Sequence, residues 1–282
     1  MKKFSKYLVI LLISLLFVTW LGISAVSQEK FKIGYDIYWL GNTWSVMLAE
    51  EFKHAVERPE YKDIVEPVYT ESENDTNKMI NNIEDLIAQE CDAIIITPTS
   101  MTALNPVLRK AREAGIKVVL NATRVDDPEA YDALVYYDNY LISRDRMEWM
   151  ARKLNYKGKV LEIVGRPLVP ITGEDNNGFL KKWDWIREEQ EAGNEFYYKF
   201  DSVAHAMPVY LSVTSLEVAI KLLKGIPVEF EQNYDFPKAI LEQGIGLIAA
   251  DQLDEYVKPD LPDSINTLTT LTDEELREIF KE

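Results

Sequence analysis

Aromatic and polar side chains gather where strands of this sequence are expected to end. Trp39, Asn42 and Trp44 lie at the end of one apolar segment, and Asn121 and Arg124 lie at the end of another. The same kind of side chain recurs beyond three later extended segments, as Asp138, Asp175 and His205. An aromatic ring can stack on the apolar face of a sugar, while carboxylate, amide, imidazole and guanidinium groups hydrogen-bond to its hydroxyls. These residue types therefore indicate a monosaccharide site.

Strands and helices alternate through the first half of the sequence. We expect strands at 31–39, 64–72, 92–97, 116–121, 133–139 and 157–165, and helices at 43–58, 75–90, 102–115 and 141–154. Continuous runs of Ile, Val and Leu, each followed by a single helix, predict a parallel sheet covered on both faces. Ligands bind outside the carboxyl ends of the strands in such a sheet, which is where the candidate residues fall.

Several helix boundaries carry local signals. Asp75 is placed to cap one helix, and Gly115 is placed to end another. Beyond residue 165 the pattern becomes irregular, although 208–225 reads as a long helix. Close to the end of the sequence, Thr272 and Glu275 predict a short helix that begins with a capping box.

Composition and charge narrow the class of protein. The 282 residues are 47% hydrophobic and 28% charged, which is ordinary globular composition. A formal net charge of −16 argues against nucleic-acid binding, because contact with phosphates needs basic patches. Cys91 is the single cysteine, so an intramolecular disulfide is excluded, and we expect this side chain to be a small buried hydrophobe.

Residues 1–27 have the pattern of a secretory signal peptide. Three lysines precede an apolar run of about 14 residues, and small residues precede Gln28. The run is shorter than the roughly 20 residues that span a bilayer. We therefore expect export with cleavage and no membrane insertion of the mature chain, which would be periplasmic or otherwise extracytoplasmic.

Five segments together resemble a known family. They are KIGYDIYWLGNTW, IEDLIAQECDAIIITPTSMTALNPVLRKAREAGIKVV, YYDN, PLVPITGEDNNG and VKPDLPDSIN. The chain is similar over nearly all of its mature length to periplasmic sugar-binding proteins of the ribose/galactose-binding type, which feed ABC importers. The resemblance implies an α/β fold of two doubly wound parallel-sheet lobes joined by a hinge, with the sugar trapped between them.

The resemblance also implies domain boundaries. After the leader, we expect a first lobe at 28–140, a second lobe with hinge crossings at 141–240, and a tail at 241–282 that returns across the lobes.

Candidate ligand contacts carry over residue by residue. Asn42 and Trp44 match the polar and stacking pair of the first loop, and either Asn121 or Arg124 matches the polar group after the fourth strand. Asp175 matches a carboxylate of the second lobe. The site is completed by residues with weaker matches, namely His205, Trp39 with Tyr38, and Asp138 with Asn139. Simpler interpretations stay open, because Asn42 and Asp138 can cap helices, Trp44 can be a core residue and Asp175 can belong to a turn.

The stretch EIVGRPLVPITG departs from the family pattern. Two apolar strands, KVLEIVG and PLVPITG, are separated by Arg166 alone. The family has helices, strands and a sugar-binding arginine between them. Since one strand–helix–strand unit takes about 30 residues, we predict an internal deletion of about 60 to 90 residues that truncates the second lobe and exposes strand edges and apolar surface.

The function that follows is capture of a monosaccharide or polyol and its delivery to the permease of an ABC importer. A sugar sensor for a chemoreceptor or kinase, and a non-functional deleted remnant, remain alternatives. An enzyme is not expected, because the sequence has two histidines and no HExxH, CxxC or phosphate-binding glycine loop. We also expect no cofactor and no metal, and the leader argues against a transcriptional regulator.

Overall fold

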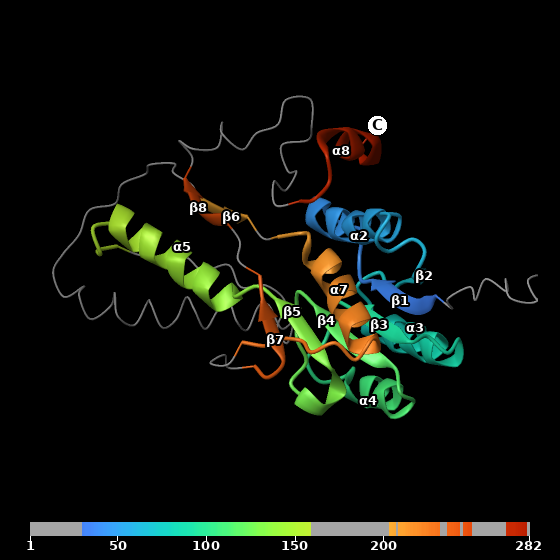
Figure 1. Ribbon diagram of the computed structural model, residues 1–282. Helices are drawn as coiled ribbons and strands as arrows, with labels where there is room; N and C mark the ends of the chain where they lie inside the picture. The colour runs from blue at the N-terminus through green and yellow to red at the C-terminus, as the bar shows by residue number, and fades with distance from the viewer. Residues whose placement is uncertain are drawn as a thin grey trace, which may run out of the picture. The chain divides into compact units, whose positions relative to one another are not determined.

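A computed structural model of the chain describes residues 30–158, 208–231, 236–242 and 269–280, together with the backbone of 203–206 and 245–249 (Figure 1). The chain divides into two compact units, Met1–Lys30 and Phe31–Glu282. All the helices and strands of the described part belong to the second unit.

The described part contains a parallel sheet of six strands in the order β2-β1-β3-β4-β5-β7. Neighbouring strands are parallel throughout, as the apolar runs predict. The strands are β1 (Phe31–Ile37), β2 (Val65–Glu71), β3 (Ala93–Ile96), β4 (Lys117–Asn121), β5 (Ala133–Tyr136) and β7 (Ala239–Leu241). All six carboxyl ends therefore meet at one edge of the sheet.

The helices begin and end close to the expected residues. They are α2 (Thr43–Val56), α3 (Thr76–Ala88), α4 (Asn105–Glu113), α5 (Asn139–Lys153), α7 (Leu211–Leu223) and α8 (Asp273–Ile279), with a short 3₁₀ turn η1 (Pro128–Ala130) before β5. The predicted cap of α3 is confirmed, because the Asp75 side chain accepts from the backbone N of Lys78 at 2.8 Å. The predicted capping box of α8 is also confirmed, with Thr272 and Glu275 bonded in both directions.

Both faces of the sheet are buried. Along β3, Ile95 packs into a cluster that includes α2 and α7, while Ile94 and Ile96 pack into a second cluster with α3 and α4. Successive side chains of a strand point to opposite faces, so a continuous apolar strand supplies both cores. Cys91 joins the second core and is 2% exposed, which confirms that it is a buried hydrophobe.

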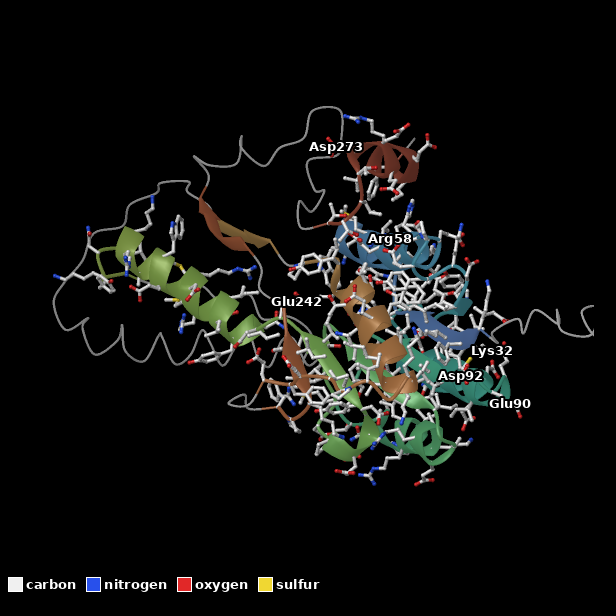
Figure 2. All side chains as sticks on the ribbon, in the orientation of Figure 1. Lys32, Arg58, Glu90, Asp92, Glu242 and Asp273 are labelled. Carbon is white, nitrogen blue, oxygen red and sulfur yellow. The ribbon has the colours of Figure 1, made fainter. Side chains whose placement is uncertain are left out.

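Backbone and side-chain hydrogen bonds join neighbouring elements at the start of the sheet. The Asp92 carboxylate accepts from the backbone N of Lys32 at 2.7 Å, and the backbone N of Asp92 donates to the carbonyl of Lys32 at 2.8 Å. The two residues lie beside each other at the amino ends of β1 and β3 (Figure 2). These hydrogen bonds fix the register of β1 relative to β3.

Elements from beyond residue 200 complete the first sheet. Helix α7 packs on β3, β4 and β5, and β7 forms the strand next to β5. Both lie well beyond residue 140 in the sequence, so the chain returns to this sheet from its later part. A separate antiparallel pair is formed by β6 (Val203–Ala206) and β8 (Ile245–Ala249). The predicted domain boundaries stay predictions, and the junction at Arg166 lies outside the described residues.

Two expected elements differ at their ends. The strand expected at 133–139 ends at Tyr136, and the helix expected at 141–154 begins earlier, at Asn139. The reason is local, because the Asp138 side chain accepts from the backbone N of Leu141 at 2.9 Å and caps the helix. Within the ranges that the structure describes, none of the helices has the length and apolar character needed to cross a bilayer.

Candidate functional site

The candidate site begins with the loop between β1 and α2. Asn42 is exposed and caps α2, with its side-chain oxygen accepting from the backbone N and the hydroxyl of Ser45 at 2.8 Å and 2.9 Å. The Ser45 hydroxyl also lies 2.7 Å from the Tyr38 hydroxyl. The cap interpretation of Asn42 is therefore confirmed, and the residue lies in the loop that follows the carboxyl end of β1. Sequence reasoning missed Ser45, although its spacing from Asn42 is typical of capping.

The Trp39 side chain folds back over Gly41, two residues further along the chain. A Cβ built on Gly41 would lie 1.9 Å from Cζ2 of the Trp39 indole, so only glycine admits the ring in this position. The indole is half-buried, with Leu40 exposed beside it. The loop thus offers an aromatic surface whose position depends on Gly41.

Trp44 is half-buried and is shared between two apolar clusters. It packs against the core that includes α7 and against a smaller cluster formed by Met47, Val209, Leu271 and Leu276. Its ring meets Tyr137 edge to face at 6.3 Å between centroids. This contact joins the first turn of α2 to the segment after β5. Trp44 is therefore packed against the core and in contact with a neighbouring loop at the same edge.

A buried carboxyl group underlies the same edge. Asp36 is 1% exposed and accepts from Thr70 at 2.7 Å, Ser72 at 2.6 Å and Asn82 at 2.8 Å. The backbone N of Ser72 in turn donates to the carbonyl of Ile37. The network joins β1, β2 and α3 and supports the loop that carries Trp39 and Asn42. A lone aspartate inside an apolar strand was the signal for it in the sequence.

Asn121 lies at the end of β4 and is fully buried. Its side-chain oxygen accepts from the Ser215 hydroxyl on α7 at 3.1 Å, and its amide nitrogen has no hydrogen-bond partner within the described ranges. The next residue, Ala122, has φ of 63°, a left-handed conformation that non-glycine residues rarely adopt. The turn directs the chain away from the strand at once, and Thr123 fastens it by donating to the carbonyl of Pro98 at 2.9 Å.

Arg124 is directed toward the segment that leads into β7. Its guanidinium lies 4.1 Å from the centre of the Phe236 ring, a cation–π contact. Burial raises the pKa of Tyr131 to about 12, while the nearby Arg124 charge acts in the opposite direction. Of the two alternatives after the fourth strand, Asn121 is buried against α7 and Arg124 stacks on an aromatic ring, and the contacts described for them do not include Asn42 or Trp44.

The three remaining candidates are Asp138, Asp175 and His205, and only Asp138 has a described side chain. Asp138 is half-buried and caps α5, as the simpler interpretation held. Asp175 lies outside the described residues. His205 lies in β6, where its backbone is opposite Leu247 of β8, and its side chain is outside the described part. The structure thus brings together the loops after β1 and β5, and the ligand roles of all eight residues stay predictions.

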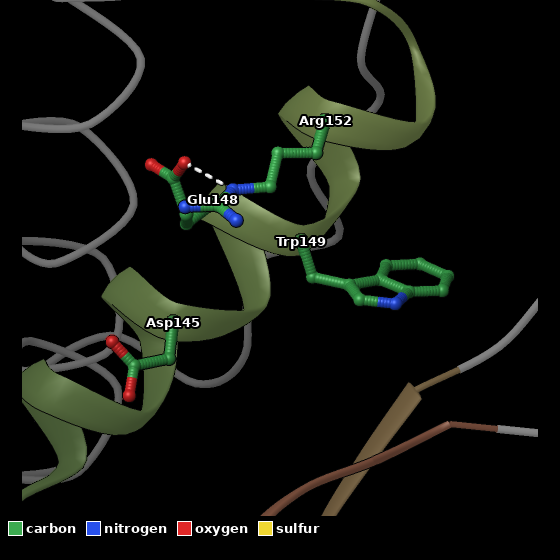
Figure 3. A pocket seen from close by; sticks show the side chains of 4 residues that line it. All are labelled: Asp145, Glu148, Trp149 and Arg152. Atoms are coloured by element: carbon green, nitrogen blue, oxygen red, sulfur yellow. Dashed lines mark hydrogen bonds and ion pairs between the residues drawn. The ribbon is translucent and has the colours of Figure 1, made fainter.

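A cavity of about 320 Å³ lies against α5 and is lined by Asp145, Glu148, Trp149 and Arg152 (Figure 3). Arg152 Nε donates to Glu148 Oε1 at 2.8 Å, and Trp149 points away from that pair. The lining residues all come from one helix, and none of the eight predicted residues is among them. In the parts of the chain that the structure describes, no three potential metal ligands are grouped together.

The parallel sheet and its loop-lined edge define an α/β ligand-binding domain, and comparison with known proteins gives the family. The periplasmic binding protein domain family matches residues 33–206, more than half of the chain, so the chain belongs to this family. Proteins of the family are periplasmic or otherwise extracytoplasmic transport components and not enzymes, which agrees with the expectation from the motifs.

Relatives and solved structures extend the comparison. The ribose import binding protein RbsB of Bacillus subtilis (strain 168) is 29% identical over 54% of this chain and 48% of its own length. The D-ribose/D-allose-binding protein of Pseudomonas aeruginosa is 28% identical over 66% of this chain and 61% of its own. The chain therefore spans about half to three fifths of these curated relatives.

The fold is shared with a solute binding protein of an ABC transporter from Bacillus halodurans C-125 that holds myo-inositol. The TM-score is 0.67 at 18% identity, over 83% of this chain and 99% of the other. The predicted fold class is thereby confirmed as the α/β periplasmic-binding-protein fold. Truncation of the second lobe stays a prediction.

Proposed function

We propose that this chain is an extracytoplasmic solute-binding protein that captures a monosaccharide or polyol between two lobes and delivers it to an ABC-type permease. The observation that carries the proposal is at the carboxyl edge of the sheet, where Asn42 caps α2 and Trp44, in the first turn of the same helix, meets Tyr137 after β5. An aromatic ring beside amide and carboxyl groups is the combination that sugar hydroxyls and sugar C–H faces require.

The chemical class of the ligand is supported by the relatives. Their names include ribose, allose and xylitol binding, and the solved structure of similar fold holds myo-inositol. These molecules share a dense array of hydroxyl groups on a small carbon skeleton. We therefore expect a polyhydroxylated ligand, either a ring or an open chain.

A mechanism follows from the family fold. The ligand ring stacks on Trp44, while Asn42, Asp175 and the group after β4 hydrogen-bond to its hydroxyls. Hinge bending then closes the second lobe on the ligand, and the closed form docks on the permease. Asn121 and Arg124 remain alternatives for the group after β4, and His205 would contribute from the β6 crossing.

Intrinsic tryptophan fluorescence tests the proposal. The purified protein is titrated with ribose, allose, xylitol and myo-inositol, and Trp39 and Trp44 should report any ligand that enters the edge. A saturable change with one of these ligands, abolished by Trp44→Ala in folded protein, is the expected result. A flat response across the panel, from protein shown by circular dichroism to be folded, contradicts the proposal and favours a deleted remnant.

A sensor role is the second candidate. The fold is also that of a fructose binding periplasmic domain of a hybrid two component system, with a TM-score of 0.63 at 14% identity. At this identity the likeness concerns the fold alone. Sugar-dependent stimulation of a permease's ATPase separates transport from sensing, because only a transport protein should produce it.

A further inference from the structure

One face of helix α2 is covered by the end of the chain. Trp44, Met47, Glu51 and His54 recur at spacings of three and four residues on α2, so they share one face, and Arg58 follows just beyond the end of the helix. The segment that covers this face is Thr269–Phe280, which includes α8 and is called the C-terminal strap below. Figure 2 labels Arg58 at the α2 end and Asp273 at the start of α8.

The carboxyl-terminal half of this face is held by hydrogen bonds. Glu51 is fully buried, and its carboxylate accepts from the hydroxyls of Thr269 and Thr270 and from the backbone N of Thr270 at 2.6 Å. The Thr270 hydroxyl also accepts from Arg58 Nη2 at 2.5 Å. A buried carboxylate is costly unless its oxygens are satisfied. Two consecutive residues of the strap supply these bonds, so they fix the strap's position along α2.

The amino-terminal half of the face is apolar. Trp44 and Met47 pack with Leu271 and Leu276 of the strap, with Ile279 and Phe280 around them. Met47 and Leu276 are fully buried. Leu271 follows Thr270 directly, so the hydrogen bonds to Glu51 determine where the apolar side chains of the strap meet Trp44.

We propose that the C-terminal strap positions the Trp44 ring for ligand binding and that Glu51 is the residue that anchors it. The indole is in contact with the strap's apolar cluster and with Tyr137 beside the end of β5. Loosening the strap removes packing from one of these sides, so the ring loses its fixed orientation. The ligand part of this inference rests on the proposed function, whereas the placement of Trp44 does not.

Glu51→Gln tests the anchor with little change in shape. The glutamine side chain has an amide NH₂ group in place of one carboxylate oxygen. The strap therefore loses one of the two oxygen atoms that accept its hydrogen bonds. The matched control is Glu50→Gln, because Glu50 lies next to Glu51 and pairs with Lys53 at 2.7 Å instead of with the strap. Acrylamide quenching of Trp44 is measured without ligand, as the difference between each protein and its Trp44→Phe counterpart. Ribose, xylitol and myo-inositol titrations are then compared.

The expected result is stronger quenching of Trp44 in Glu51→Gln, with the control unchanged. Ligand affinity should fall about two- to tenfold, because a ring that has lost its fixed orientation must be ordered again on binding. If Glu51→Gln does not fold, Thr270→Val is used in its place, because it removes one hydroxyl from the same contact.

Two results overturn the inference. One is unchanged Trp44 quenching in folded Glu51→Gln, and the other is a moved Trp44 with unchanged ligand affinity. If the unsubstituted protein binds none of the probes, the proposed function and the ligand part of this inference fail together. Trp44 quenching then still decides whether the strap holds the ring.

Discussion

Asn42 closes the first turn of α2 through its side-chain oxygen, and the residue is exposed in the loop after β1. Capping and ligand binding are therefore compatible in one side chain, and a single alanine substitution would remove both. Serine separates them, because it is also a good N-terminal cap but has no carboxamide.

We expect Asn42→Ala to lower the free energy of unfolding by about 1 kcal/mol and Asn42→Ser to leave it nearly unchanged. Both variants should weaken ligand binding if the carboxamide contacts a hydroxyl. Urea unfolding and fluorescence titration measure the two effects on the same preparations. Retained affinity in Asn42→Ser would assign Asn42 to capping alone.

The residue types of the site were readable from the sequence, but their partners were not. The cap by Asn42 and the cap by Asp138 follow from local spacing. The stacking of Arg124 on Phe236 and the bond between Ser215 and Asn121 join residues far apart in the chain, and no local pattern encodes such a pairing. Asp36 stands out locally as an aspartate inside an apolar strand, but its three donors could not be predicted, since they come from β2, the loop that follows it and α3.

At the scale of elements, the periodicity predicted the helices and strands of the first sheet closely. Apolar strands of four to seven residues alternate with amphipathic helices. In such segments the spacing of the apolar residues shows both the type of element and the face that is buried. The contribution of α7, β7 and α8 to the first lobe could not be predicted in the same way. Their place depends on where a long chain returns, which is a tertiary property.

The capping box of α8 gives an acid-sensitive element. The pKa of Glu275 is lowered from its usual value of 4.5, chiefly by the hydrogen bond with the backbone of Thr272, with a smaller contribution from His54, whose Nδ1 lies 3.2 Å from the carboxylate. A lowered pKa in the folded state means that the stabilisation is present above about pH 4.5 and is lost as pH falls through the folded-state value.

We therefore expect the protection of backbone amides in 269–280, taken relative to their intrinsic exchange rates at each pH, to fall on acidification more in the unsubstituted protein than in Glu275→Gln. The variant should begin with faster exchange at neutral pH, because its cap is already weakened. Glu274→Gln is the control, as its neighbouring carboxyl lies on an exposed residue. Identical acid profiles for the unsubstituted protein and Glu275→Gln would contradict the assignment of this transition to the capping box. Mass spectrometry of the C-terminal peptide provides the measurement.

At the scale of the whole molecule, the predicted deletion has a physical consequence. A shortened second lobe would leave strand edges and apolar surface without cover, and such surfaces associate. We expect the purified protein to self-associate with rising concentration, as measured by sedimentation velocity. A monomer at all concentrations that also binds one of the polyols tightly would contradict the deletion and favour a complete ligand-binding protein.

The position of the C-terminal strap in the sequence also bears on the order in which parts of the chain can fold during synthesis. The sheet begins with β1 at Phe31, but β7, α7 and the strap are contributed by residues beyond 208. A ribosome therefore delivers the first five strands before the α7 side of the first core can close, and α2 remains uncovered until 269–280 have emerged. Contacts between such distant segments slow folding. We therefore expect the first sheet to reach its final packing only after residues beyond 208 have been made.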